Sequence, residues 1–395
     1  MELLIRLFRR ETVSTDFIPV IDGLRFLAIA MVVLFHINAF VFERVVNQKL
    51  TFPSLFSANN FMALGYQGVQ LFFVISGFIL AVPFLREQFG LSERKPSYKS
   101  YILRRITRLE PPYIIAILGC FALLAIFSRD KIPMDDLLLS LGSSLAYAAN
   151  FVFPGEKPHI NVVTWSLEIE VQYYLIAPFV VTALCSLKGK VARRAVILFA
   201  IVAFGAFSWW LEAVVQLRVV SLANYFQYFL AGILLCDVYL LDRERLASLS
   251  HWTVALMGIG LLLAILLTDH ALALDVRMKI LSPLMIMAFY LITFGNTLWN
   301  RVFSLPLVTL IGGMCYSIYL IHAPIVAIIG RFVTPRLTFE NFYVFFAVQS
   351  IVSLALILAA SSVYFLCIEK PFMSRDWYKR FVARFRGRET VPQGS

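Results

Sequence analysis

Long apolar runs separated by short polar segments form the main pattern of this sequence. A helix that crosses a bilayer needs ~20 mostly apolar residues. Ten runs fit this requirement: Pro19 to Val41, Phe61 to Leu85, Pro111 to Phe127, Val162 to Leu187, Ala195 to Val215, Leu222 to Leu241, Trp252 to Leu267, Ile280 to Leu298, Leu305 to Gly330 and Tyr343 to Cys367. A further run, Met134 to Phe153, is ambiguous because Asp135, Asp136 and several Ser and Gly residues interrupt it. The pattern predicts an all-α, polytopic membrane helix bundle with ~10 transmembrane helices.

The distribution of Lys and Arg decides how the ambiguous run is interpreted. If it does not cross and the N-terminus is cytoplasmic, the inner segments carry 24 Lys and Arg residues and the outer segments carry 10. A crossing at this run would place Lys188 to Arg194 and the basic tail outside. The positive-inside rule therefore predicts cytoplasmic N- and C-termini, with the Met134 run as an outer-face or re-entrant helix. We expect a basic N-terminal segment at 1–18, a transmembrane domain at 19–367 and a basic tail at 368–395.

Composition excludes a soluble protein. The chain is 60% hydrophobic and 15% charged, with a mean hydropathy of +0.80, whereas roughly a quarter of a soluble domain is charged. The first apolar run is too long for the core of a signal peptide, so we interpret it as an uncleaved span. The five cysteines have no short spacing and the five histidines form no pair at ligand spacing. These patterns argue against a disulfide framework and against a metal site.

Apart from Asp22 near its entry, the first predicted span carries two ionisable side chains, Arg25 and His36, which are eleven residues apart. Eleven helical steps close three turns to within ~20°, so both lie on one face, separated by ~16 Å along the axis. A charge inside a membrane is costly and usually functional. The alternative is that Arg25 extends to the inner headgroups and that His36 only packs.

A basic segment precedes the third predicted span. In it Arg105 and Arg108 are three residues apart and share a face if the segment is helical. Guanidinium groups bind phosphate in a fork geometry, which suggests a site for a phosphorylated cytoplasmic ligand. An ordinary positive-inside cluster attracted to anionic lipid is the alternative.

Two further polar sets lie in the outer half of the predicted membrane. Glu170 shares a helix face with Ser166, and His322 shares one with Tyr319. Glu170 and His322 lie at similar depths, ~12 Å from the outer surface, so we expect Glu170 to contact His36 or His322 and to raise the basicity of the imidazole. The alternatives are an interfacial Trp-Ser entrance and a packing histidine beside a proline kink.

These residues together resemble the acyltransferase-3 family of integral membrane acyltransferases. The resemblance runs from Ile18 to Phe372. Its marks are Asp22-Gly23-Leu24-Arg25 followed by His36, Gly68 to Phe78 with Ser76-Gly77 for close helix approach, Arg105 with Arg108 before Pro111, Trp165-Ser166-Leu167 with Glu170, Tyr316 to His322, and Ile368 to Phe372. One departure is Glu170-Val171-Gln172 where the family often has Glu-Glu-Gln, with an additional Glu168 upstream.

The resemblance implies a ten-helix bundle that moves an acyl group, usually acetyl, from cytoplasmic acyl-CoA to a hydroxyl of a sugar or glycolipid. The acceptors in the family include lipopolysaccharide, exopolysaccharide, peptidoglycan and macrolides. It also implies functional roles for Arg25, His36, Arg105, Arg108 and Glu170. We expect a multi-pass protein of the cell inner membrane, with acetyl-CoA as a substrate, no permanently bound cofactor and no nucleic-acid partner.

The resulting hypothesis has three parts. The CoA phosphates bind Arg105, Arg108 and Arg25, and the pantetheine arm lies along the stripe from Arg25 to His36. His36 acts as general base on the acceptor hydroxyl, with an acyl-His36 relay as the alternative. Glu170 orients His36, while the substrate contacts Trp165, Ser166, Tyr319 and His322. The rival class is a proton-coupled transporter of a small solute or glycolipid, which CoA dependence would distinguish.

Overall fold

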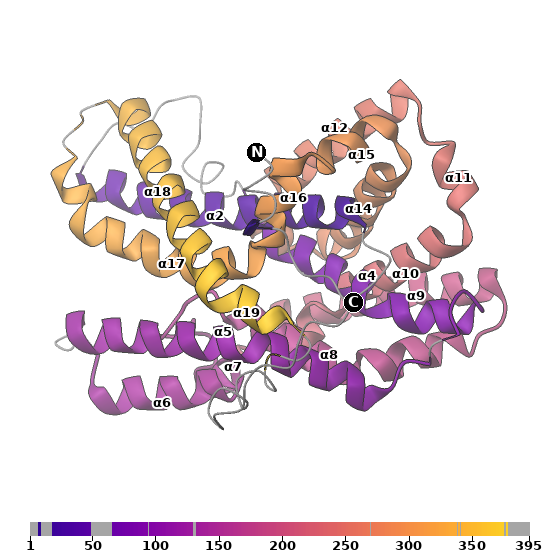
Figure 1. Cartoon of the computed structure of the whole chain (residues 1–395), viewed down its shortest axis with the longest axis horizontal. Coiled ribbons are helices and arrows are strands. Elements are labelled where there is room, and N and C mark those ends of the chain that lie inside the picture. Colours follow the sequence, from indigo (N-terminus) through magenta and orange to yellow (C-terminus); the bar gives the residue numbers. More distant parts are fainter. Residues whose placement is uncertain are drawn as a thin grey trace, which may run out of the picture.

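The structure is a computed structural model. It describes residues 7–8, 18–48, 65–93, 95–128, 132–268, 270–337, 339, 341–374 and 377. The predicted start of the second span at Phe61 lies outside the described residues, as do most of residues 1–18 and 368–395. The described residues form helices and no strand, packed into one bundle (Figure 1).

The helices follow the predicted apolar runs. In chain order they are α2 (Pro19–Gln48), α4 (Gly68–Gln88), α5 (Tyr98–Phe127), α6 (Met134–Leu145), α7 (Ala149–Val152), α8 (Trp165–Cys185), α9 (Lys190–Ala213), η1 (Leu222–Asn224), α10 (Phe226–Leu241), α11 (Arg243–Ala247), α12 (Trp252–Leu267), α13 (His270–Ala273), α14 (Val276–Gly295), α15 (Thr297–Phe303), α16 (Pro306–Gly313), α17 (Cys315–Phe332), η2 (Thr334–Arg336), α18 (Phe342–Tyr364), η3 (Phe365–Glu369) and α19 (Lys370–Met373). Within the described ranges, eight helices are long and apolar enough to cross a membrane, and α10 and α12 are shorter apolar helices. The predicted all-α polytopic bundle is confirmed.

Helix α4 lies at the centre of the bundle and packs against α2, α8, α10 and α14. Its closest neighbour is α10, and glycines on both helices make this approach possible. A Cβ added at Gly77 would lie 2.2 Å from the carbonyl oxygen of Phe229, and one added at Gly232 would lie 2.2 Å from that of Val74. The close helix approach predicted at Ser76-Gly77 is therefore confirmed, and it fixes the position of Ser76.

The predicted start of the third helix at Pro111 is wrong. Helix α5 begins at Tyr98 and continues through Pro111 and Pro112, so the basic segment belongs to the helix. Pro111 has no N–H to offer the carbonyl of Thr107 four residues earlier. The indole nitrogen of Trp377 donates to that carbonyl instead, at 2.9 Å. A side chain from near the C-terminus thus supplies the hydrogen bond that Pro111 cannot make, and the helix continues through the proline.

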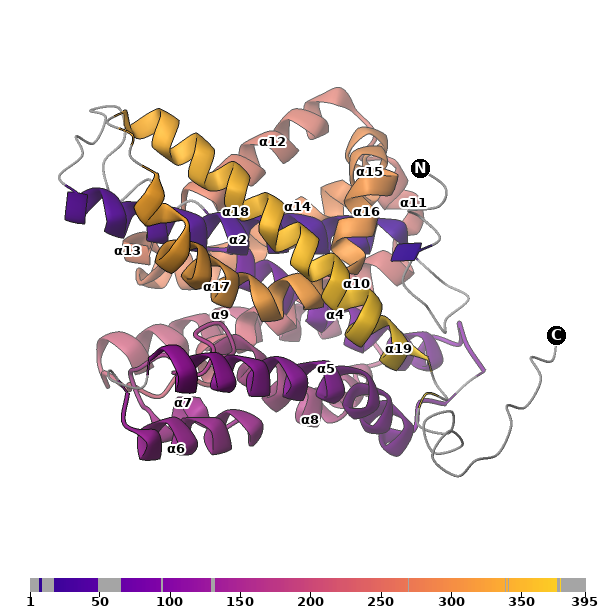
Figure 2. The same cartoon turned by 60° about the vertical axis from the view of Figure 1, so that its left-hand side comes forward.

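The ambiguous Met134 run forms a short helix that turns back along α5 (Figure 2). Helix α6 has 12 residues, too few to cross a bilayer. Its last turn reaches the middle of α5, where the Tyr113 hydroxyl donates to the Ser144 carbonyl at 2.8 Å. The short α7 follows, and the buried carboxylate of Glu168 accepts from the backbone nitrogens of Ala149 and Asn150, at 3.1 and 2.9 Å. Glu168 therefore anchors this returning segment to the start of α8.

The predicted single span from Leu305 to Gly330 is also wrong, because the chain breaks into α16 and α17 at Met314. The break follows two glycines, and α16 packs so closely on α2 that a Cβ at Gly312 would lie 1.7 Å from the carbonyl oxygen of Asp22. This contact places the start of α17 beside Arg25. Figure 2 shows α18 crossing obliquely over α2 and α17.

Helix α17 bends at a second proline. Pro324 cannot donate to the Leu320 carbonyl, and the side-chain amide of Asn161 donates to it at 2.8 Å. The polar loop before α8 thus supports the turn of α17 that carries Tyr319 and His322.

Candidate functional site

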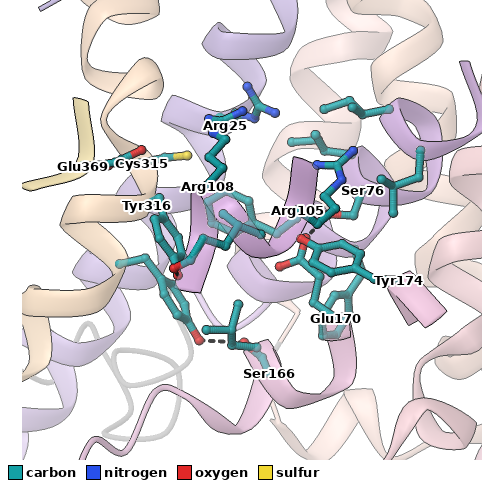
Figure 3. A pocket seen from close by; sticks show the side chains of 18 of the residues that line it. Arg25, Ser76, Arg105, Arg108, Ser166, Glu170, Tyr174, Cys315, Tyr316 and Glu369 are labelled. Carbon is teal, nitrogen blue, oxygen red and sulfur yellow. Dashed lines mark hydrogen bonds between the residues drawn. The ribbon is translucent and has the colours of Figure 1, made fainter. Parts of the chain in front are cut away.

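A cavity bounded by α2, α4, α5, α8 and α17 gathers most of the predicted site residues. It encloses about 920 Å³, counting the part that is open to the surface. Three guanidinium groups surround it, those of Arg25, Arg105 and Arg108, together with the carboxylates of Glu170 and Glu369 (Figure 3). These five helices, the end of α16 at Gly313 and the π-helical turn η3 therefore contribute to one polar site inside an apolar bundle.

The three arginines are held in different ways. Arg25 Nη1 donates to Asp22 Oδ1 one turn earlier on α2, at 2.6 Å. The guanidinium of Arg105 lies 5.7 Å from the centroid of the Tyr101 ring and 5.4 Å from that of Tyr174, within cation–π range. Arg108 Nε has no hydrogen-bond partner within the described part of the chain. Arg105 and Arg108 share one face of α5, as their spacing predicts.

The carboxylates of the cavity are bound by serine hydroxyls. Ser76 Oγ donates to Glu170 Oε1 at 2.5 Å. Glu369 accepts from the backbone nitrogen of Ser317 at 3.0 Å and from its hydroxyl at 2.5 Å. Each carboxylate thus has a serine donor, and the cavity wall carries three positive and two negative groups.

The expected contact between Glu170 and a histidine is not found among these residues. Depth along the bilayer normal suggested this pairing, but depth does not specify which way a helix faces. The face of α8 that carries Glu170 packs against α4, so Ser76 is its neighbour. His36 and His322 lie elsewhere, on α2 and α17.

Ser166 and Tyr319 form a polar wall of the cavity. The Tyr319 hydroxyl donates to the carbonyl of Val163, and Ser166 Oγ lies 2.7 Å from the same hydroxyl. Since the Tyr319 hydrogen is already used, we assign Ser166 as the donor of this second bond. Trp165 does not line the cavity, and its ring lies 5.6 Å from that of Tyr225.

The two histidines lie next to each other beyond this wall. Neither lines the cavity. The His322 ring lies 6.1 Å from that of Tyr319, and His322 Nε2 lies 3.4 Å from His36 Nδ1. His36 Nδ1 also lies 2.8 Å from the carbonyl oxygen of Val32. A carbonyl oxygen can only accept, so Nδ1 carries the hydrogen and Nε2 of His36 is left with its lone pair.

Arg25 and His36, which were predicted to share one face of α2, therefore have different surroundings. Arg25 faces the cavity, whereas His36, further along α2, lies against α17. Among the described residues, no group of three or more His, Cys, Asp or Glu side chains could hold a metal ion.

Several cavity residues were not predicted as site residues. Ser76 was interpreted as a packing position, and no role was assigned to Glu369 or Cys315. A signal for Glu369 was available, because a carboxylate follows a long apolar run directly in the Ile368 to Phe372 motif. Ser76 and Cys315 are small residues in apolar surroundings, and only the packing of α4 and α17 brings them to the cavity.

Comparisons with known proteins identify the family of the chain. A family model described as an acyltransferase domain matches residues 18–365. YrhL of Bacillus subtilis (strain 168), provisionally named a peptidoglycan O-acetyltransferase, is 28% identical over 199 residues, which are 47% of this chain and 27% of YrhL. O-acetyltransferase OatA of Staphylococcus aureus (strain NCTC 8325 / PS 47) is 21% identical over 364 residues, which are 81% of this chain and 52% of OatA.

The chain thus spans about half or less of the length of these relatives. No solved structure matches it.

Proposed function

Because the chain belongs to the acyltransferase-3 family, we propose that it is a membrane O-acyltransferase. It moves an acetyl or other short acyl group from cytoplasmic acyl-CoA to a sugar hydroxyl of a cell-surface polysaccharide or glycolipid. The relatives support an acetyl group and a glycan acceptor, since they are named O-acetyltransferases and one name specifies peptidoglycan. The chain is a multi-pass membrane protein. We place it in the cell inner membrane, with the basic end of α5 in the cytoplasm.

The cavity supports acyl-CoA as the donor, and its three guanidinium groups are the observation that carries this proposal. CoA bears several phosphate charges, which arginine binds through paired N–H donors. Arg108 Nε is free to bind a ligand, and Arg105 is held by aromatic rings, leaving its planar edge for an anion. Glu170 and Glu369 also accept hydrogen bonds from serine hydroxyls, which hold these carboxylates at the cavity wall beside the donor.

His36 supplies the base in this proposal. Its Nε2 takes the proton of the acceptor hydroxyl, and the hydroxyl oxygen attacks the thioester carbonyl. The tetrahedral intermediate then expels the CoA thiolate, which receives the proton from His36. His36 is partly exposed, so an acceptor can reach it, and this proposal requires the thioester to extend from the cavity beyond Tyr319.

Donor binding is the first experiment. Acetyl-CoA affinity is measured by calorimetry with purified protein in detergent, for wild type, Arg108→Gln and the control Arg104→Gln. Arg104 lies on the same helix, is exposed and does not line the cavity, so both variants remove one charge from α5. Loss of a charge-assisted contact is expected to weaken binding at least ~10-fold in Arg108→Gln only. Equal, small effects in both variants would indicate that these arginines determine membrane topology and do not bind the donor.

Turnover is the second experiment. Radiolabelled acetyl-CoA is supplied to proteoliposomes, and release of CoA and labelling of added glycan fragments are followed. His36→Ala is expected to retain donor binding and to lose transfer. Wild-type rates in this variant would reject His36 as the base, whereas absence of donor binding in folded wild-type protein would reject acyl-CoA as the donor.

A further inference from the structure

Two histidines from distant parts of the chain lie against each other outside the cavity. His322 Nε2 is 3.4 Å from His36 Nδ1, and the two rings meet edge to face with centroids 4.9 Å apart. His322 is completely buried, whereas His36 is partly exposed. A substrate can therefore reach His36 but not His322, which argues against the substrate contact expected of His322 from the sequence.

Backbone carbonyls determine which ring nitrogens of His322 carry hydrogen. Its Nδ1 lies 3.0 Å from the carbonyl oxygen of Ile318 and 2.9 Å from that of Tyr319. Both groups can only accept, so we assign the hydrogen to Nδ1. The Nε2 of His322 then presents a lone pair to the Nδ1–H of His36. The two imidazoles thus have matching donor and acceptor atoms, and no third group is needed to align them.

The inference rests on the proposed function, in which His36 is the general base. We infer that His322 is a positioning residue that holds His36 with its Nε2 free and stabilises the protonated form of His36. At rest the Val32 carbonyl is the nearer acceptor for His36 Nδ1–H, at 2.8 Å. When the acceptor proton arrives at Nε2, the ring becomes cationic and its Nδ1–H becomes a stronger donor. The lone pair of His322 is already in place, so the contact strengthens as charge develops.

The surroundings of α17 keep His322 in this position. Pro324 follows two residues later, and Asn161 bonds the carbonyl of Leu320 that this proline leaves without a donor. Glu170, the carboxylate expected to orient His36, is engaged by Ser76 instead. Histidine thus takes the place that a carboxylate holds in many histidine-based sites, and it does so without adding a negative charge to the interior of the membrane.

The test compares His322→Phe with His322→Gln and with the control His251→Phe, which replaces an exposed histidine that does not line the cavity. Phenylalanine keeps a ring but removes the acceptor, while glutamine can place an amide oxygen near the position of Nε2. For His322→Phe we expect kcat to fall about 10- to 100-fold, the usual effect of losing a hydrogen bond to a charged group, with little change in KM for acetyl-CoA. His322→Gln should recover most of this loss. His251→Phe should leave kcat within a few-fold of wild type.

A second measurement does not depend on turnover. Diethyl pyrocarbonate reacts with the free nitrogen of a neutral, accessible imidazole, so mass spectrometry can follow modification of His36. The rate is expected to fall in His322→Phe and to stay near wild type in His322→Gln and His251→Phe. Unchanged kcat and unchanged His36 reactivity in His322→Phe would overturn the inference. Full transfer by His36→Ala would instead reject the proposed function, so the two failures are distinguishable.

Discussion

The contact between α4 and α10 leads to a quantitative prediction at Gly77. A Cβ at this position would lie 2.2 Å from the Phe229 carbonyl oxygen, whereas ordinary contact begins near 3.4 Å. The clash is with backbone, which cannot rotate away, so the helices must separate by roughly 1 Å. Overpacking costs ~1–3 kcal/mol, and the better helix propensity of alanine returns just under ~1 kcal/mol. We expect Gly77→Ala to lower the free energy of unfolding by about 1 kcal/mol, and by at most about 2 kcal/mol.

Gly119→Ala is the matched control. Gly119 also lies inside a long helix, but a Cβ added there meets no heavy atom within 4 Å, so this variant should gain up to ~1 kcal/mol. Both are measured by unfolding in mixed micelles with increasing dodecyl sulfate. Because Ser76 precedes Gly77 and lines the cavity, Gly77→Ala should also weaken acetyl-CoA binding. Equal stability of the two variants would refute the reasoning that this helix contact is tight and unyielding.

Three further predictions concern single hydrogen bonds. Asn161→Ala leaves the buried Leu320 carbonyl without a donor and should cost ~1–3 kcal/mol of unfolding free energy. In a Pro324→Ala background the helix regains its own N–H, so the same change should cost clearly less. A double mutant in which the two effects are fully additive would contradict this account. Glu168→Gln keeps one acceptor for the two backbone nitrogens of α7 and should lower the free energy of unfolding by ~1–2 kcal/mol. It should also speed proteolysis between α6 and α8 in proteoliposomes. Resistance to proteolysis equal to that of wild type would contradict the role of Glu168 as an anchor. Ser76→Ala removes the hydroxyl that donates to the cavity carboxylate and should weaken acetyl-CoA binding a few-fold with little loss of stability, and an unchanged affinity in calorimetry would show that this bond does not shape the site.

Much of the bundle could be predicted from the sequence, because a bilayer demands apolar runs of a set length and tolerates few charges. The eight long helices and the two shorter ones coincide with the predicted runs. The ends of helices were less predictable. The start of α5 was placed at Pro111 because Lys and Arg usually mark a loop, and the donor that satisfies this bend, Trp377, comes from a remote segment.

The charged residues that line the cavity could be predicted from the sequence. Arg25, Arg105, Arg108 and Glu170 are conspicuous in or beside apolar runs, and all four line one cavity. Partners were harder to assign. Counting residues along helices gives depth, and it placed His322 and Glu170 at similar levels, but only packing decides that His36 meets His322 while Glu170 meets Ser76.

The hydrogen bonds next to Pro111 and Pro324 can form only in the order in which their donors and acceptors are translated. Asn161 leaves the ribosome before Leu320, so the carbonyl freed by Pro324 finds its donor already made. The carbonyl of Thr107 is made long before the Trp377 that pairs with it. This bond cannot form before Trp377 has been made, so the arginine-bearing helix α5 reaches its final form only after most of the chain has been translated. Nascent protein that has not yet reached Trp377 is therefore expected to hold its donor site in an unfinished state.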